Sequence, residues 1–423
     1  METLLTRLVG VPDSHRIDTY VARGGYEGLR KALKMTPDAV IDEVKKANLR
    51  GRGGAGFPCG TKWSFVDQKS PKPKYMVVNA DEGEPGTFKD RLLMEWDPHG
   101  MLEGTIIGSY AIRASTAYIY VRGELRKSYD RVMAAVAEAY DKGFLGKNVL
   151  GSGWSCDVTV HRGAGAYICG EETALLNSLE GKRGQPRFKP PFPAVVGLFG
   201  APTIVNNVET LACVPWIVTR GSAWFASAEA GGVEGNGGPK LYCISGHVNR
   251  PGVYELPHST TGLGLIDAAG GITGGRALKA FIPGGSSTPP LTPAESDVRM
   301  DFDSVKKAGS LLGSAGAIAL RDGTCLVRFL WKLLKFYHHE SCGQCTPCRE
   351  GTGWLERIAW KLEHGQGSVA ELGIMEAASK RMIGTTICVL SDAAAMPALD
   401  FYKKWKDEFV GHVGKKGPCD LEA

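Results

Sequence analysis

The feature that most restricts this chain is a group of closely spaced cysteines near its C-terminal end. Cys342, Cys345 and Cys348 are separated by two residues each time, and Cys388 follows after the 39 residues at positions 349 to 387. A C-x2-C-x2-C loop suits a [4Fe–4S] cube, because it presents three sulfurs to three irons while a distant cysteine ligates the fourth. The spacing therefore favours a fold that brings Cys388 back to this loop around an iron–sulfur cluster.

Other uses of these cysteines fit less well. A structural zinc site can take four thiolates, but it usually takes them from two separated C-x2-C pairs. Disulfides are disfavoured in an intracellular chain. His338 and His339 lie just before the loop, and two histidines at a helix end are more typical of surface or packing positions than of ligands. Zinc stays open as the alternative.

A glycine-rich segment is the second informative feature. Arg50 to Pro58 reads Arg-Gly-Arg-Gly-Gly-Ala-Gly-Phe-Pro and contains a formal G-x-G-x-x-G. It follows an amphipathic helical pattern at 38–46 instead of a strand, so it is not the usual dinucleotide turn. Such a loop brings backbone N–H groups close to an anion, with Arg50, Arg52 and Lys62 as compensating charge. Phe57, Trp63 and Phe65 could stack on a heterocycle, or the segment could be a tight turn with core aromatics.

Two further glycine-containing segments follow strand-like runs. They are Asn79 to Gly86, with Asp81, Glu82 and Glu84, and Gly163 to Thr173, with Glu171 and Glu172. Carboxylates at strand ends can accept hydrogen bonds from ribose or flavin hydroxyls, although paired acids also cap helices or stay solvated. Asn206 and Asn207 offer amides to a heterocycle edge, or only a helix N-terminus.

Length and composition set the class of protein. At 423 residues the chain allows two to four domains, and a net charge of +5 without a long basic block gives little support to nucleic-acid binding. No apolar run approaches the roughly 18 residues of a membrane span, and the N-terminus lacks a signal-peptide pattern. The absence of G-x-S-x-G and H-E-x-x-H patterns gives hydrolase chemistry no support. We expect a soluble, intracellular redox protein.

Composition shifts along the chain predict four parts. Residues 1–50 form a helical segment, and residues 51–229 form an α/β domain in which strands at 74–78 and 117–121 alternate with helices such as 129–140. The stretch 231–239, rich in glycine, predicts a flexible and poorly packed boundary. Residues 240–324 form a small β-rich domain that begins with a hairpin turning at 249–251, and residues 325–423 form a helical domain.

Four motifs in order resemble one family. Arg50 to Pro58, Asn79 to Gly86, Gly163 to Thr173 and Glu340 to Glu350 together look like the F subunit of NADH-quinone oxidoreductases, over about residues 15 to 410. The resemblance implies a Rossmann-like FMN and NADH domain, a ubiquitin-like β-grasp (SLBB-type) domain and a C-terminal helical bundle with a [4Fe–4S] cluster. Cys59 stands where such chains often carry threonine, so we expect a redox-sensitive thiol near the site.

The resemblance also implies site residues. Those around FMN would be Gly51, Gly54, Lys62, Asn79, Asp81, Glu82, Tyr167, Gly170, Glu171, Glu172, Asn206 and Asn207. Those that meet NADH would be Phe57, Phe65, Glu84, Lys189 and Phe192. The cluster ligands would be Cys342, Cys345, Cys348 and Cys388. No general acid or base is required, because hydride transfer depends on placement of the donor carbon.

The implied activity is NADH dehydrogenase in a respiratory complex I. Hydride would pass from NADH to FMN, and single electrons would pass to the cluster and on to a thioredoxin-like [2Fe–2S] subunit and a large iron–sulfur subunit, on the cytoplasmic side of the inner membrane. Membrane contact would occur only through the complex. One alternative is the diaphorase subunit of a soluble NAD-linked hydrogenase or formate dehydrogenase. Another, of a different class, is a zinc-stabilised nucleotide-binding scaffold.

Overall fold

The N-terminal helices pack beside a parallel sheet and deliver the chain to the glycine-rich loop. The computed structural model describes residues 2–415 of the chain. The first helices are α1 (Ile17–Ala22), α2 (Glu27–Ala32), α3 (Pro37–Lys46) and α4 (Cys59–Ser64). Thr36 caps α3 by accepting a hydrogen bond from the Ala39 N–H, and Pro37 occupies the first helical position. Because α3 buries Val40, Ile41 and Val44, it fixes where the loop 47–58 begins.

The first sheet is entirely parallel and has the order β3-β2-β1-β4. Its strands are β1 (Tyr75–Ala80), β2 (Thr116–Val121), β3 (Asp157–Arg162) and β4 (Thr203–Asn207). Asn79 pairs in register with both Tyr120 and Asn207, so the carboxyl ends of three strands meet at one edge. The chain winds from β1 outward through β2 to β3 and then returns to the other side of β1. The direction of winding therefore reverses between β1 and β4, and the carboxyl ends of these two strands form the switch point where parallel sheets place ligands.

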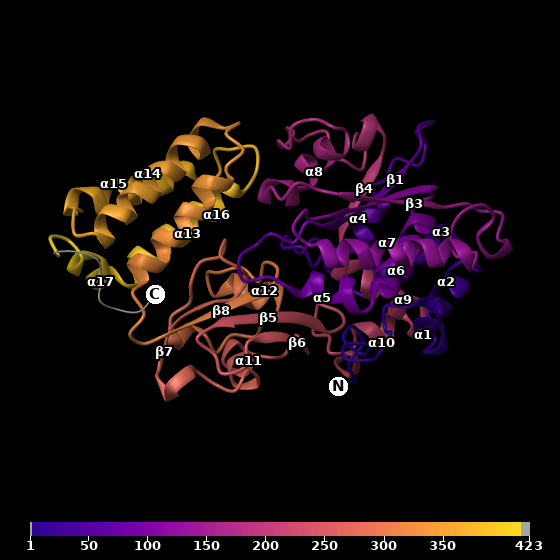
Figure 1. Cartoon of the computed structure of the whole chain (residues 1–423), viewed down its shortest axis with the longest axis horizontal. Coiled ribbons are helices and arrows are strands. Elements are labelled where there is room, and N and C mark those ends of the chain that lie inside the picture. Colours follow the sequence, from indigo (N-terminus) through magenta and orange to yellow (C-terminus); the bar gives the residue numbers. More distant parts are fainter. Residues whose placement is uncertain (1, 416–423) are drawn as a thin grey trace.

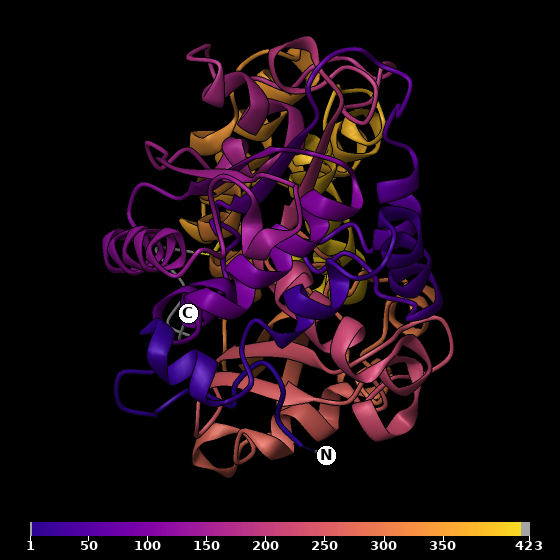
Figure 2. The same cartoon turned by 90° about the vertical axis from the view of Figure 1, so that its right-hand side faces the viewer.

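Helices cover both faces of this sheet, as the views in Figures 1 and 2 agree. The helices that follow β1 in this part of the chain are α5 (Lys89–Trp96), α6 (Pro98–Ala111), α7 (Arg126–Asp141), α8 (Glu172–Leu179), α9 (Val208–Arg220) and α10 (Ser222–Ala226). Short 3-10 turns lie at Val149–Gly151, Tyr167–Gly170, Leu198–Gly200, Ala228–Ala230, Thr273–Gly275 and Pro293–Glu295. Parallel strands buried on both faces need continuous apolar runs, and Met76, Val77 and Val78 are fully buried.

A second, mixed sheet follows with the order β6-β5-β8-β7. Its strands are β5 (Lys240–Gly246), β6 (Gly252–Leu256), β7 (Leu278–Ile282) and β8 (Gly316–Arg321), with helices α11 (Gly262–Ala268) and α12 (Phe302–Lys307). The predicted hairpin is present, since β5 and β6 pair antiparallel across residues 247–251. The N-terminal end of the chain lies beside this sheet (Figure 2), where Leu4 and Leu5 donate backbone hydrogen bonds to Glu255.

The glycine-rich stretch 231–239 is not the poorly packed linker that its composition predicted. Gly232 and Asn236 are buried, and the Gly237 and Gly238 N–H groups donate to Asn48 and Phe225 carbonyls. A Cβ on Gly237 would lie 1.9 Å from the Ala47 carbonyl oxygen. The glycines serve close backbone packing between the two sheet-containing parts, whereas composition alone indicates flexibility.

Buried charges also join these parts. The Glu209 carboxylate on α9 lies 2.9 Å from Lys89 Nζ and 2.6 Å from Lys240 Nζ of β5, and all three side chains are fully buried. Burial alone would raise the pKa of Glu209, but Lys240 and Lys89 lower it to about 2. The ionised carboxylate therefore offsets two buried ammonium groups that would otherwise be very costly.

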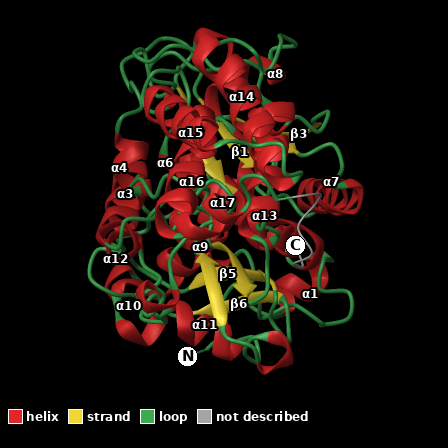
Figure 3. Ribbon diagram, turned by 90° about the vertical axis from the view of Figure 1, so that its left-hand side faces the viewer, coloured by secondary structure: helices red, strands yellow, loops and turns green. Residues whose placement is uncertain are grey.

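The C-terminal region is helical (Figure 3), as predicted from its periodicity. Its helices are α13 (Leu326–Glu340), α14 (Thr346–Glu363), α15 (Val369–Met382), α16 (Leu390–Lys404) and α17 (Lys406–Gly411). The cysteine loop at 341–345 joins α13 to α14 and carries Cys342 and Cys345, whereas Cys348 lies in the first turn of α14 and Cys388 precedes α16. Within residues 2–415, no helix combines the length and the apolar content needed to cross a membrane.

Candidate functional site

The switch point of the first sheet brings the two acidic glycine segments together. Asn79 at the end of β1 donates from Nδ2 to the Gly170 carbonyl (2.8 Å), and its Oδ1 accepts from the Asp81 N–H (3.1 Å). The segments 81–88 and 163–171 therefore lie together at the carboxyl edge of the sheet, where a parallel sheet forms its ligand crevice. Sequence reasoning placed both at strand ends, and the parallel register explains why they meet.

Asp81 and Arg122 lie at this edge with unused hydrogen-bonding capacity. Asp81 Oδ2 and Arg122 Nη1 are buried, and neither atom has a hydrogen-bond partner among the described residues. The nearest approach of the two groups is 3.9 Å. Buried polar atoms are normally satisfied, so an acceptor and a donor left over at one edge fit a bound molecule rich in hydroxyl and carbonyl groups, such as a flavin mononucleotide.

A group of alternating charges stands opposite, between α4 and α8. Lys62 Nζ lies 3.1 Å from Glu172 Oε2 and donates to the Val205 carbonyl (3.0 Å). Lys189 Nζ lies 2.7 Å from Glu171 and 3.4 Å from Glu172. Burial opposes ionisation of Glu172, but Lys62 and Lys189 lower its pKa below the ordinary value. Lys62 and Lys189 thus share Glu172 as an ion-pair partner beside the crevice.

The glycine-rich loop offers backbone N–H donors to a ligand, but its arginine side chains are engaged within the protein. In the described chain, the N–H groups of Gly53, Gly54 and Ala55 donate to no protein acceptor, and Gly54 has a φ of +129° with open space at its Cβ position. The Arg52 side chain, however, is fully buried, and its guanidinium forms hydrogen bonds with His258 and with the Gly237 carbonyl. Arg50 pairs with Asp303. Of the three cations expected to face an anion, only Lys62 is placed to do so.

Exposed aromatic rings lie next to this loop. Phe57 and Phe65 are 47% and 55% exposed, and their ring centroids are 6.1 Å apart. Phe192 is also exposed, and its segment is tied to the end of α4 by the hydrogen bond from the Asp67 N–H to the Ala194 carbonyl. Apolar rings that a folded chain leaves in water beside a crevice suit stacking on a planar ligand.

Glu84 of the first domain contacts the β-rich domain directly and the helical domain through Tyr167. The Tyr167 hydroxyl donates to Glu84 Oε2 (2.6 Å), and the Ser287 N–H donates to Oε1 (2.8 Å). Burial raises the pKa of Glu84, although these hydrogen bonds oppose the shift. Tyr167 in turn packs against Phe336 of α13. The β-rich domain therefore reaches the site through Ser287, a contact for which the sequence carried no signal.

Three further sequence-predicted residues use their side chains within the protein. Asn206 is buried and accepts from Trp63 Nε1 (2.8 Å). Asn207 caps α9 and donates to Asp90. Glu82 accepts from the Asp90 and Arg91 N–H groups, and burial raises its pKa to about 7. The side chains of Asn206, Asn207 and Glu82 are therefore engaged within the protein.

The four predicted cluster cysteines line one cavity. Its walls are Cys342, Cys345, Cys348 and Cys388, with Ile168, Pro186, Gln344, Thr386, Ile387 and Leu390. Cys345 occupies the N-cap position of α14, and Cys348 lies in its first turn. The Ile387 N–H points at Cys345 Sγ (3.5 Å) and Ser341 Oγ lies 3.2 Å from Cys348 Sγ. Four thiols with N–H and O–H donors are the ligand set of an iron–sulfur cube.

This cavity adjoins the crevice through one short segment. Ile168 lines the cysteine cavity, and the N–H of its neighbour Tyr167 donates to Glu340 at the end of α13 (3.1 Å). The same Tyr167 bonds Glu84 on the crevice side. The segment 167–170 therefore separates the two places by a single turn of chain.

Two expectations about single residues have different outcomes. Cys59 is 1% exposed, and burial raises its pKa to about 12. A redox-sensitive thiol needs an exposed thiolate, so that expectation is wrong. The His338 side chain is half exposed and pairs with Glu356, and the His339 side chain is exposed. Neither histidine lines the cysteine cavity. They are surface residues, as expected.

Arg122 and Glu340 are the residues that sequence reasoning missed. Arg122 follows the last residue of β2, so the rule that ligands gather at the carboxyl ends of parallel strands could have found it. Glu340 begins the cysteine motif, but nothing in the sequence connects it to Tyr167.

The stability of the chain without a bound ligand should depend on Asp81 and on pH. Burial raises the pKa of the Asp81 carboxyl from 3.8 to about 7. The unfolded state therefore loses this proton at a lower pH than the folded state does. The contribution of the protonated carboxyl to the free energy of unfolding is full below pH 3.8 and is lost as the pH rises to 7. An Asp81→Asn variant avoids this loss. The free energy of unfolding of the variant, relative to that of the wild type, should increase by up to about 1.4 kcal/mol for each unit that the pH rises between 4 and 7. Urea denaturation at several pH values measures it, and a pH-independent difference would contradict the assignment.

Family models match most of the chain. The Nuo51 FMN-binding domain matches residues 44–216, the SLBB domain matches residues 241–291, and the NADH-ubiquinone oxidoreductase-F iron–sulfur binding region matches residues 328–412. Together with the two sheets and the helical region, these matches confirm the predicted multi-domain α/β fold class.

Similar proteins cover nearly the full length. The NADH-quinone oxidoreductase F subunit numbered 2 of Rhizobium meliloti (strain 1021) is 54% identical over 98% of both chains. The NADH-quinone oxidoreductase F subunit of Mycobacterium bovis is 51% identical over 97% of this chain and 93% of the relative. Among solved structures, an NAD+-reducing [NiFe]-hydrogenase in the H2-reduced state is 34% identical, with a TM-score of 0.84 over 100% of this chain and 68% of that chain.

Proposed function

This chain belongs to the F-subunit family of NADH-quinone oxidoreductases, and from this membership we propose that it oxidises NADH and delivers the electrons singly to further redox centres. The observation that carries the proposal is the segment 167–170, which contacts the crevice through Tyr167 and the four-cysteine cavity through Ile168. FMN and a [4Fe–4S] cluster are its cofactors, and NADH is the substrate.

FMN, when bound, supplies two-electron acceptance with one-electron release, and the [4Fe–4S] cluster supplies one-electron transfer. The chain's own residues place and orient the reactants. The N–H groups of Gly53 and Gly54, which have no acceptor within residues 2–415, and the Lys62 ammonium would hold the phosphate. Asp81 and Arg122 offer the unused acceptor and donor for polar groups of the flavin.

The remaining assignments follow the same reasoning. We assign FMN contacts to Gly51, Gly54, Lys62, Asn79, Asp81, Glu82, Tyr167, Gly170, Glu171, Glu172, Asn206 and Asn207, with backbone contacts for those whose side chains are engaged. NADH contacts are assigned to Phe57, Phe65, Glu84, Lys189 and Phe192. The cluster ligands are Cys342, Cys345, Cys348 and Cys388.

Electrons that reach the cysteine cavity need an acceptor outside the chain. The family name is that of one component of a quinone-reducing enzyme, so partner subunits are implied. We propose a thioredoxin-like [2Fe–2S] subunit and a large iron–sulfur subunit as these partners, and a peripheral position on the cytoplasmic side of the inner membrane. Quinone itself would be reduced elsewhere in the complex.

An anaerobic optical titration of the purified complex with NADH tests the function. We expect a flavin band to bleach together with loss of the broad iron–sulfur absorbance. Flavin bleaching without any change in the iron–sulfur absorbance would break the proposed sequence of transfer. A preparation containing zinc and no flavin would instead favour a nucleotide-binding scaffold.

The similarity to an NAD+-reducing hydrogenase supports a second candidate, a subunit that exchanges electrons between NAD and a hydrogenase. Both candidates use the same crevice and cavity, so only the partner distinguishes them. Reduction of NAD+ by H2 in the purified complex would support the second candidate, and NADH-dependent reduction of quinone without H2 oxidation would support the first.

Removal of the Phe65 ring should weaken NADH binding while FMN stays bound. Alanine substitution shows that stacking of a base on an aromatic ring contributes about 1–3 kcal/mol. With the lower part of this range, about 1–2 kcal/mol, Phe65→Ala should raise the KM for NADH about 5- to 30-fold. Phe199→Ala is the matched control, since Phe199 is equally exposed (55%) but packs on Tyr75 at the opposite end of β1. Loss of FMN from the Phe65 variant would contradict the assignment.

A further inference from the structure

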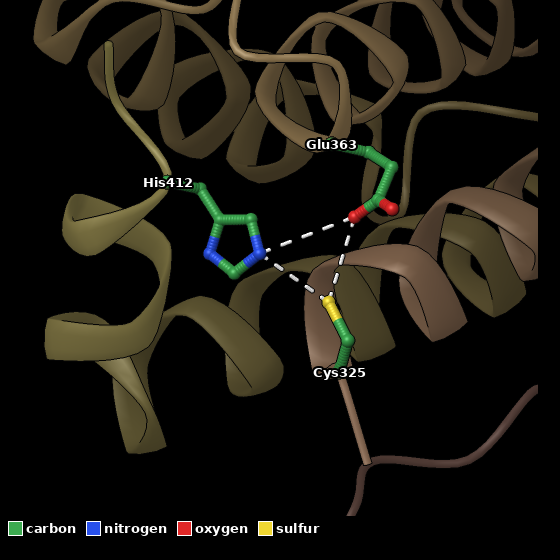
Figure 4. Close-up of side chains that lie close together, drawn as sticks. All are labelled: Cys325, Glu363 and His412. Carbon is green, nitrogen blue, oxygen red and sulfur yellow. Dashed lines mark hydrogen bonds and ion pairs between the residues drawn. The ribbon is translucent and has the colours of Figure 1, made fainter. Parts of the chain in front are cut away.

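A second group of metal-binding side chains lies at the other end of the helix pair that carries the cysteine loop. Cys325 directly precedes α13, Glu363 is the last residue of α14, and His412 directly follows α17. All three side chains are buried, and they point toward one another (Figure 4). None of them lines the four-cysteine cavity.

The distances among their ligand atoms suit one small ion. Cys325 Sγ lies 3.3 Å from His412 Nε2 and 3.5 Å from Glu363 Oε2, and the nitrogen and oxygen are 4.0 Å apart. Zinc bonds of about 2.3 Å to sulfur and about 2.0–2.2 Å to nitrogen and oxygen give tetrahedral edges of roughly 3.3–3.6 Å. Two edges therefore already match, and the third would close by about half an ångström.

Each ligand is oriented by a second interaction. His412 Nδ1 lies 2.7 Å from the Glu408 carbonyl oxygen. A carbonyl only accepts, so Nδ1 carries the proton and the lone pair of Nε2 faces the sulfur and the carboxylate. Glu363 Oε1 accepts from Arg328 Nε (2.7 Å), and Oε2 is the oxygen that faces Cys325 and His412. Outer hydrogen bonds of this kind accompany metal-ligating histidines and carboxylates.

The Cys325 sulfur is also held in place by the start of α13. Cys325 caps the N-terminus of this helix, and the Arg328 N–H points at its sulfur (3.4 Å). A mixed sulfur, nitrogen and oxygen set in a buried position is typical of zinc.

We propose that Cys325, Glu363 and His412 bind a structural zinc ion, with a fourth donor from water or another group. Binding replaces the thiol proton with the metal and releases it to solvent. The ion would tie the start of α13 to the ends of α14 and α17. Cys325 lies four residues after β8 ends at Arg321, so the ion would also fix where the helical region leaves the mixed sheet.

This site and the cysteine loop occupy opposite ends of α13. The helix has 15 residues, which corresponds to about 22 Å at 1.5 Å per residue. The zinc ion is therefore a clamp for the helix pair and takes no part in electron transfer. Its loss should loosen the helical region and leave the four thiols in the distant cavity intact.

Metal analysis of the whole complex, purified anaerobically, tests the proposal. We expect Cys325→Ser and His412→Ala each to lower the zinc content by one atom per complex, with FMN and iron unchanged. Cys156→Ser is the matched control, because Cys156 is an equally buried cysteine on the first domain, and it should keep its zinc. Equal zinc in the wild type and both variants would overturn the proposal.

Wild-type crystals give a test that does not depend on the variants folding. Anomalous difference maps collected on either side of the zinc absorption edge should show a peak among Cys325, Glu363 and His412. A peak only at Cys342, Cys345, Cys348 and Cys388 would mean that zinc occupies the cluster position. Either that result or no peak among the three side chains would refute the clamp.

Discussion

Replacement of Cys388 with alanine should remove the [4Fe–4S] cluster and stop electron delivery to quinone, while NADH oxidation by a soluble dye continues. Cys388 is the one sulfur of the four-cysteine cavity that does not come from the 342–348 segment. Without it, one iron has no protein ligand. Loss of an outer hydrogen bond alone costs roughly 10- to 100-fold in metal affinity, and loss of the ligand should exceed that.

Electron paramagnetic resonance of the NADH-reduced complex, with iron analysis, measures this effect. Quinone-linked activity should fall at least about 100-fold, and the cluster signal should vanish. Cys213→Ala is the control, because Cys213 is a buried cysteine of α9 outside the cavity. An unchanged reduced-state signal in the Cys388 variant would disprove its role as a ligand.

Replacement of Lys62 with alanine should weaken FMN binding more than any other single change in the crevice. Lys62 is the only one of the three expected cations that the structure places to face an anion, because Arg50 pairs with Asp303 and Arg52 is buried on His258. A hydrogen bond to a charged group contributes about 1.5–3 kcal/mol, which corresponds to roughly a 10- to 150-fold rise in the Kd for FMN.

Equilibrium titration of the flavin-free protein with FMN provides the measurement. Lys46→Ala is the matched control, since Lys46 is an exposed lysine in the last turn of α3, shortly before the same loop. Its Kd should stay at the wild-type value. If Lys62→Ala also binds FMN with wild-type affinity, the phosphate is held by the backbone N–H groups alone.

The sequence by itself identified the parts of the site. The cysteine spacing predicted the four residues that line one cavity, and the strand-like runs before Asn79 and Gly163 predicted segments that meet at the switch point. The sequence could indicate these segments because the spacing of metal ligands and the alternation of strands and helices are local properties. The hairpin of the second sheet and the helical C-terminal region were local in the same sense.

Only the tertiary structure decided which side chains face the crevice. Arg52 and Lys62 look alike in the sequence, yet one is buried on His258 and the other stands beside Glu172. Cys59 and the stretch 231–239 look reactive and flexible, and both are packed. The clamp of Cys325, Glu363 and His412 joins residues up to 87 positions apart. Burial and side-chain direction depend on contacts between distant segments, and those contacts exist only once the whole chain has folded.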